Sequence, residues 1–84
     1  MTIRIYTTRW CGYCRAAKAL LNERGLAFEE IPVDGDSATR ARLAHEHDGY
    51  STVPMVFIDD RFIGGYDQLA ALDRAGKLAG SSHS

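Results

Sequence analysis

Two cysteines separated by two residues, Cys11 and Cys14, constrain this 84-residue chain more than any other feature. They are its only cysteines, and they lie between an alternating apolar stretch at residues 3–6 and a segment rich in Ala, Leu, Lys and Arg at residues 13–24. The first stretch is typical of a strand and the second of a helix. The pair is therefore expected where a strand leads into the N-terminus of a helix.

A cysteine at a helix N-terminus faces unpaired backbone N–H groups and the positive end of the helix dipole. Both favour the thiolate form of Cys11, which is the nucleophilic form of a cysteine. Cys14 follows one helical turn later, close enough to form a disulfide and shielded enough to remain a thiol until then. The motif predicts a dithiol that exchanges with other disulfides.

Two structural interpretations of the cysteine pair are weaker. A structural zinc site takes four ligands, and the other candidates are His45, His47 and His83. The first two lie two positions apart on a predicted helix and so point to different faces, while His83 lies in a polar tail. A purely structural disulfide across so short a loop would remove little chain entropy. Redox chemistry is the favoured interpretation.

Composition and charge place the chain among ordinary globular domains. It is 45% hydrophobic and 25% charged. Its net charge of −1 gives no electrostatic reason to expect nucleic acid or an anionic membrane as a partner. Its sequence shows neither an apolar run of membrane-spanning length nor a signal-peptide pattern. We therefore expect a cytoplasmic protein, in which an exposed cysteine pair is more often catalytic than structural.

Strand and helix patterns alternate along the chain. The expected strands cover residues 1–7, 26–33, 54–58 and 61–63, and the expected helices cover residues 11–24, 37–47 and 66–75. Gly25 and Gly76 follow two of these helices as caps, and Asp59-Asp60 forms a hairpin turn. Pro32 places the second strand near an edge or an end.

This β-α-β-α-β-β-α order predicts an α/β fold with a small mixed sheet. The first strand–helix–strand unit implies a parallel pair joined by a right-handed crossover, and the hairpin adds antiparallel strands. We expect one domain over residues 1–78 and a disordered polar tail over residues 79–84.

Two short motifs outside the cysteine pair have both structural and functional interpretations. Gly64-Gly65-Tyr66-Asp67 reads locally as a tight turn in which Asp67 caps the last helix. It also suits an anion site, because glycines and free N–H groups allow a carboxylate or phosphate to approach closely. Thr52-Val53-Pro54 reads locally as a strand start after a trans proline, since only about 5–6% of X–Pro bonds are cis.

The residues beside the cysteines are aromatic and basic. In a loop next to a reactive thiol, Trp10 and Tyr13 are expected to form the wall of a substrate groove. Arg9 and Arg15 lie close enough to Cys11 in the sequence to stabilise its thiolate.

From residue 3 to about residue 78 the chain resembles the glutaredoxins, in particular the bacterial glutaredoxin-3 type. The combination of the cysteine pair, Thr-Val-Pro and Gly-Gly-x-Asp in this order is specific, although each motif alone is weak. The matching segments are Ile5-Tyr6-Thr7, Cys11-Gly12-Tyr13-Cys14, Ala17-Lys18-Ala19-Leu20-Leu21, Val33-Asp34-Gly35, Thr52-Val53-Pro54, Phe57-Ile58-Asp59, Ile63-Gly64-Gly65-Tyr66-Asp67 and Ala71-Leu72-Asp73.

The resemblance implies a thioredoxin fold, with a four-stranded mixed sheet flanked by three helices. It implies that Pro54 is cis and lies against Cys11, which exposes the Val53 backbone to the cysteinyl backbone of glutathione. The amides of Tyr66 and Asp67 would hold the γ-glutamyl carboxylate, and the Asp67 side chain would hold the ammonium group. The full implied glutathione-binding set is Arg9, Tyr13, Thr52, Val53, Pro54, Gly65, Tyr66 and Asp67.

The resemblance also implies an enzyme that uses glutathione as a cosubstrate. The Cys11 thiolate would take glutathione from a protein–glutathione mixed disulfide, and a second glutathione would release it. With a protein disulfide, Cys14 would resolve the intermediate. The implied partners are glutathione and proteins that are glutathionylated or carry disulfides, and the expected state is a monomer.

Some positions depart from the family pattern. Many glutaredoxins have proline where this chain has Gly12. In some members, Gly or Ser there accompanies a 2Fe–2S cluster shared by two subunits and held by the first cysteine and glutathione. Thr8 replaces a lysine that usually binds the glycine carboxylate of glutathione, with Arg9 as the neighbouring substitute, and Tyr50 replaces an arginine.

Two neighbouring families remain alternatives. Trp10-Cys11-Gly12-Tyr13-Cys14 also resembles the mycoredoxins, which use mycothiol, and Gly49-Tyr50 resembles redoxins that receive electrons from thioredoxin reductase. Mycothiol has no γ-glutamyl group, so Gly64-Gly65-Tyr66-Asp67 favours glutathione.

Overall fold

The computed structural model describes residues 2–50 and 52–78. The predicted tail at residues 79–84 lies outside these described residues. The element order matches the one expected from the sequence: β1 (Ile3–Thr7), α1 (Gly12–Glu23), β2 (Glu29–Pro32), α2 (Ser37–Glu46), β3 (Met55–Ile58), β4 (Arg61–Gly64) and α3 (Tyr66–Arg74). In the described segments, no helix combines the length and the apolar character needed to cross a membrane.

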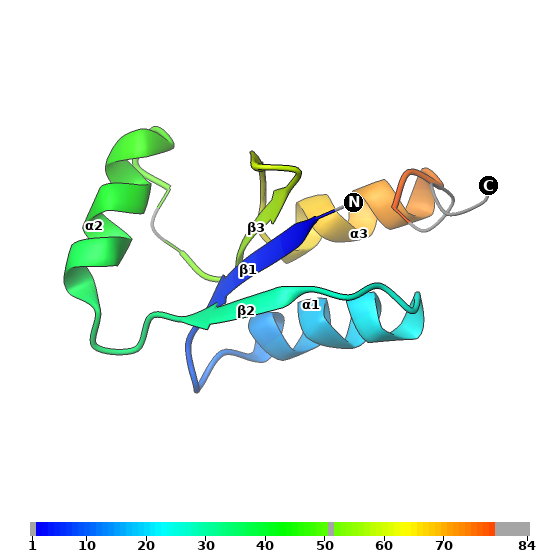
Figure 1. Ribbon diagram of the computed structural model, residues 1–84, viewed down its shortest axis with the longest axis horizontal. Helices are drawn as coiled ribbons and strands as arrows, with labels where there is room; N and C mark the ends of the chain where they lie inside the picture. The colour runs from blue at the N-terminus through cyan, green and yellow to red at the C-terminus, as the bar shows by residue number, and fades with distance from the viewer. Residues whose placement is uncertain (1, 51, 79–84) are drawn as a thin grey trace.

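The four strands form one mixed sheet in the order β2-β1-β3-β4 (Figure 1). β1 pairs in parallel with β2 and antiparallel with β3, and β3 pairs antiparallel with β4. The predicted parallel pair and hairpin are therefore confirmed. Pro32 ends β2 at the edge of the sheet, where a missing backbone N–H is tolerated.

The sheet separates two apolar clusters. Alternate residues of β1 and β3 contribute to each, because successive side chains of a strand point to opposite faces. The cluster under α1 and α3 consists of Ile3, Ile5, Ala17, Leu21, Val56, Leu69 and Leu78. The cluster on the α2 side consists of Tyr6, Val33, Leu43, Met55 and Phe57. Figure 1 shows α2 set apart from the other two helices, and Leu43 is its only buried residue.

The second strand is shorter than the predicted span of residues 26–33. Its ladder with β1 runs only from Glu29 to Pro32. The Leu26 amide cannot join this ladder, because it donates a hydrogen bond to the Leu21 carbonyl at 3.0 Å and closes the end of α1. Gly25 takes the left-handed conformation expected of a helix cap there, with φ of +68°.

The β3–β4 hairpin has a two-residue loop without glycine. Asp59 and Asp60 take φ of +52° and +66°, which aspartate tolerates better than most residues. The loop is also tied to the N-terminal segment, because Asp59 and Thr2 exchange two hydrogen bonds of 2.8 Å. The predicted turn is confirmed.

Candidate active site

Cys11 is the N-cap of α1, and its sulfur performs the capping role. Cys11 has extended backbone angles, and its Sγ accepts a hydrogen bond from the Cys14 amide at 3.0 Å. Serine or aspartate usually supplies the accepting atom at such a position. An amide donor and the positive end of a helix both stabilise negative charge on this sulfur. The predicted placement of Cys11 at the start of the helix is confirmed.

Cys14 lies inside the molecule and is only 1% exposed. Burial, and after it the neighbouring Cys11 sulfur, raises the pKa of its thiol to about 12. Both cysteines are free, and Cys11 is partly exposed while Cys14 is buried. The pair therefore has an accessible sulfur and a shielded one, as the spacing predicted.

The Val53–Pro54 peptide bond is cis. The local expectation of a trans bond is wrong, and the expectation from the family resemblance is confirmed. The Cys11 thiol donates to the Val53 carbonyl across 3.7 Å, so the loop before β3 lies directly against the first cysteine. The general preference of X–Pro bonds for trans, taken alone, could not reveal this.

The N-terminus of α3 corrects one prediction. Its N-cap is Gly65, whose N–H donates to the Gln68 side-chain oxygen at 2.9 Å, so Asp67 does not cap the helix. Asp67 lies in the first turn with an exposed carboxylate. A Cβ on Gly65 would lie 2.5 Å from the Tyr50 hydroxyl and 3.3 Å from the Pro54 carbonyl oxygen. Glycine is therefore required by the close approach of two other segments.

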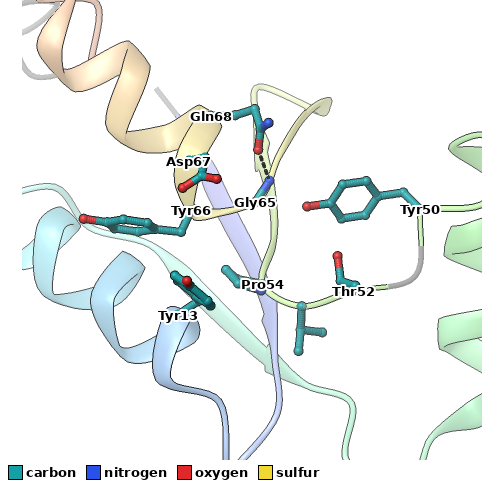
Figure 2. A pocket seen from close by; sticks show the side chains of 9 residues that line it. Tyr13, Tyr50, Thr52, Pro54, Gly65, Tyr66, Asp67 and Gln68 are labelled. Atoms are coloured by element: carbon teal, nitrogen blue, oxygen red, sulfur yellow. Dashed lines mark hydrogen bonds between the residues drawn. The ribbon is translucent and has the colours of Figure 1, made fainter.

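A cavity of about 430 Å³ lies between the loop before β3 and the start of α3. Figure 2 shows Tyr13 and Tyr66 on one side of Pro54 and Gly65, with Tyr50 and Thr52 on the other. The tyrosine rings on the first side are 6.1 Å apart between centroids. The complete lining is Tyr13, Tyr50, Thr52, Val53, Pro54, Gly65, Tyr66, Asp67 and Gln68. It includes every predicted glutathione-binding residue except Arg9.

Arg9 lies in a different place. Its amide donates to the Asp34 carboxylate at 2.8 Å, and it lines a second cavity of about 320 Å³ together with Cys14 and Arg15. Trp10 is 82% exposed and lines neither of these cavities. Of the two aromatic residues predicted to form the groove wall, only Tyr13 does so.

Two residues of the first cavity were not predicted as binding residues. Gln68 follows Gly65 by three positions, the spacing at which a glutamine side chain accepts from the N-cap amide. That spacing was the available signal for Gln68. Tyr50 was noted only as a departure from the family pattern, and its proximity to Gly65 depends on tertiary packing.

The histidines do not assemble a metal site. The His47 ring packs against Phe57 and Phe62, with centroids 5.2 and 4.6 Å away, while His45 is exposed. Over residues 2–50 and 52–78, no three His, Cys, Asp or Glu side chains are grouped so that they could hold a metal ion.

Comparison with known proteins agrees with this geometry. The family model described as Glutaredoxin matches residues 3–63. Glutaredoxin 3 of Escherichia coli K12 is 47% identical over 76 residues, covering 90% of each chain. A glutaredoxin of Pseudomonas aeruginosa is 51% identical over 74 residues, covering 88% of this chain and 87% of that one.

Solved structures give the same assignment. The buckwheat glutaredoxin–glutathione complex matches with a TM-score of 0.87 and 33% identity, over 93% of this chain and 73% of that one. The Brucella melitensis glutaredoxin matches with a TM-score of 0.82 and 40% identity, over 95% and 86%. With its thioredoxin fold and its cysteine pair at the start of α1, the chain belongs to the glutaredoxin family of thiol-disulfide oxidoreductases.

Proposed function

We propose that this protein uses glutathione to reduce protein–glutathione mixed disulfides and protein disulfides, with Cys11 as nucleophile and Cys14 as resolving residue. One observation carries the proposal. The Cys11 sulfur contacts the Val53 carbonyl, and Val53 lines the cavity that ends at the N-terminus of α3. A thiol tripeptide lying in that cavity would therefore bring its own sulfur to Cys11.

The cavity offers a complementary group for each part of the γ-glutamyl-cysteinyl unit. The amides of Tyr66 and Asp67, at the start of α3, suit the γ-glutamyl carboxylate, because helix N-termini attract anions. The exposed Asp67 carboxylate suits the ammonium group. The Val53 backbone suits the cysteinyl backbone, as an added strand does at a sheet edge. The similarity to the buckwheat glutaredoxin–glutathione complex supports this assignment.

The first step is a thiol-disulfide exchange. The Cys11 thiolate attacks the glutathione sulfur of a protein–glutathione mixed disulfide, so a Cys11–glutathione bond forms as the protein–glutathione bond breaks. The protein sulfur leaves as a thiolate and takes up a proton. A second glutathione, as thiolate, then attacks the bound glutathione sulfur, which yields oxidised glutathione and regenerates Cys11.

With a protein disulfide, Cys11 becomes linked to one sulfur of the substrate. The Cys14 sulfur then attacks Cys11 Sγ, the Cys11–Cys14 bond forms, and the substrate leaves as a dithiol. Glutathione reduces the new disulfide in two further exchanges. The 3.0 Å contact between the Cys14 amide and Cys11 Sγ keeps the two residues adjacent for this step.

We place this activity in the cytoplasm and assign it to a monomer. A reductant needs Cys11 to remain a thiol, and the glutathione and thioredoxin systems of that compartment keep thiols reduced. A purified protein that elutes as a dimer in the absence of cluster would contradict the assignment of a monomer.

The predicted 2Fe–2S cluster depends on Gly12. A Cβ there would meet nothing within 4 Å, so the position is open at the start of α1. The described residues supply no three-ligand group of their own, and glutathione would have to complete the ligand set around Cys11. Anaerobic reconstitution with iron, sulfide and glutathione tests this second role. A colourless product would contradict it.

Replacement of the nucleophile tests the proposed function. Cys11→Ser should abolish glutathione-dependent reduction of a mixed disulfide, because an alcohol cannot carry out the exchange. Arg42→Gln, on the exposed surface of α2, serves as a matched control and should keep wild-type turnover. Full activity of Cys11→Ser would refute the proposal.

A further inference from the structure

The second cavity lies beside the resolving cysteine and shares no lining residue with the first. Its volume is about 320 Å³. Most of its lining side chains are polar or charged: Thr7, Thr8, Arg9, Cys14, Arg15, Lys18, Glu30, Pro32 and Asp34. None of the steps described above uses Thr7, Lys18 or Glu30.

Those three residues form a hydrogen-bonded chain. The Thr7 hydroxyl donates to Glu30 Oε2 at 2.7 Å, and Lys18 Nζ donates to the same oxygen at 2.9 Å. Thr7 is only 1% exposed, so its hydroxyl is a fixed donor inside the protein. Both hydrogen bonds lower the pKa of Glu30, and the one from Lys18 has the larger effect. Glu30 is therefore ionised at neutral pH and holds the Lys18 ammonium group at the cavity.

Cys14 needs a nearby positive charge during the resolving step. Its sulfur is buried, and a buried thiolate has little water around it to stabilise its charge, so ionisation of the thiol is disfavoured. Lys18 lies one turn further along α1, and its charge acts in the opposite direction and favours the thiolate. The Thr8 amide, which donates to this sulfur, has the same effect.

The other charged groups around the cavity do not duplicate this role. Arg9 and Arg15 have exposed side chains, whose charges are screened by solvent. Asp34 accepts from the Arg9 amide and carries the wrong sign to favour a thiolate. The partly buried ammonium of Lys18, with 31% of its side chain exposed, is the positive charge best shielded from water.

We propose that Lys18, held in place by Glu30 and Thr7, is a positioning residue that stabilises the Cys14 thiolate in the resolving step. This inference rests on the proposed function. In the step concerned, the Cys14 proton passes to solvent in the cavity, Cys14 Sγ attacks Cys11 Sγ, and the bond from Cys11 to the substrate sulfur breaks. The two cysteines are oxidised, and the substrate sulfur leaves with the electron pair and takes up a proton.

A competing explanation is that the Lys18–Glu30 ion pair only joins α1 to β2. A purely structural pair would change the stability of the protein and would affect both reaction routes equally. A role at Cys14 affects only the route that needs Cys14. The ratio of the two rates therefore separates the explanations.

The first experiment compares reduction of a protein disulfide with reduction of a small glutathione mixed disulfide in Lys18→Met, which keeps most of the apolar stem. The ratio of the first rate to the second should fall severalfold, because loss of the Lys18 charge leaves less of Cys14 in the thiolate form. Lys18→Arg should restore most of the ratio. Arg42→Gln, which removes a more exposed helix charge that does not line this cavity, should leave it unchanged.

The second experiment needs no glutathione. In a Cys11→Ser background, the rate of Cys14 alkylation by iodoacetamide is measured at one mildly alkaline pH, with and without Lys18→Met. The rate should fall when Lys18 is replaced, because less of the thiol is then ionised. An unchanged alkylation rate, or an equal loss of both rates in the first experiment, overturns the inference. If the wild type fails to use glutathione at all, the proposed function fails, while the alkylation rate still decides the role of Lys18.

Discussion

The Cys14 amide donates a hydrogen bond to the Cys11 sulfur at 3.0 Å, so the two cysteines are in contact before any disulfide forms. The two sulfurs differ in their exposure to solvent. The Cys11 sulfur is partly exposed at the helix N-terminus, whereas the Cys14 sulfur is buried. This difference supports the proposed order, in which a substrate reacts with Cys11 first and Cys14 then attacks the Cys11 sulfur.

Replacement of the buried cysteine should separate the two routes. Cys14→Ser should retain turnover of a glutathione mixed disulfide within about threefold, because that route regenerates Cys11 with external glutathione. It should lose reduction of a protein disulfide. Parallel assays with one small mixed disulfide and one protein disulfide check this. Equal loss of both activities would mean that Cys14 is needed for more than resolution.

Removal of the Asp67 charge should weaken glutathione binding. Asp67→Asn loses the proposed partner for the γ-glutamyl ammonium group, so KM for a glutathionylated substrate should rise about 3- to 10-fold, in line with a charge-assisted hydrogen bond in an exposed site. The kcat should change little. Asp48→Asn is a suitable control, because Asp48 is exposed and its left-handed φ of +58° suits asparagine equally well. An unchanged KM in Asp67→Asn would remove this residue from the site.

A methyl group at Gly65 should be damaging, whereas one at Gly12 should not. Gly65→Ala forces the Tyr50 hydroxyl away and crowds the Pro54 carbonyl, which should cost about 1–3 kcal/mol of stability and raise KM for the glutathionylated substrate. At Gly12, a Cβ meets nothing within 4 Å. Gly12→Ala should leave the free energy of unfolding unchanged or raise it by up to about 1 kcal/mol, since alanine favours a helix over glycine. Urea unfolding of the two variants checks the contrast.

The stability of the reduced protein should fall in alkali because of Cys14. Burial raises the pKa of this thiol from 9.0 in the unfolded chain to about 12 in the folded one. Below pH 9.0 both the folded and the unfolded chain keep the Cys14 proton, so the thiol makes its full contribution to the free energy of unfolding. As pH rises from 9.0 toward 12, only the unfolded chain releases it, and the free energy of unfolding falls by at most about 1.4 kcal/mol per pH unit.

The difference between wild type and Cys14→Ser isolates this effect, because other alkaline titrations are common to both proteins. Urea unfolding at pH 8 and pH 10 under reducing conditions provides the measurement. A difference between the two proteins that does not change with pH would contradict a raised pKa at Cys14.

Much of the fold was predictable because its strands and helices have clear periodicity. The boundary of β2 was not, since the Leu26 amide is used to close α1 through the Leu21 carbonyl, a contact that strand patterns do not reveal. The same holds for the cap of α3. Asp67 is a good capping residue type, but the helix starts at Tyr66 as expected, and its N-cap is Gly65, which packs closely against Tyr50 and Pro54.

Some features of the site were likewise predictable from the sequence, and others were not. The cysteine pair was recognisable from its spacing, and the Gly-Gly-Tyr-Asp turn from its residue types. The cis state of Pro54 was expected only from the family resemblance, because local preference favours trans. The Thr7–Glu30–Lys18 chain had no signal at all. Its members come from β1, β2 and α1, and only the parallel pairing of β1 with β2 brings them together.

The use of glutathione is tested most directly by turnover of one mixed-disulfide substrate with three electron sources: glutathione with glutathione reductase, mycothiol with its reductase, and NADPH with thioredoxin reductase. We expect selective turnover with glutathione, and we expect Asp67→Asn to weaken that turnover through KM. Preferential turnover with mycothiol or with thioredoxin reductase would contradict the assignment of Gly65, Tyr66 and Asp67 to a γ-glutamyl group, while leaving Cys11 as the nucleophile.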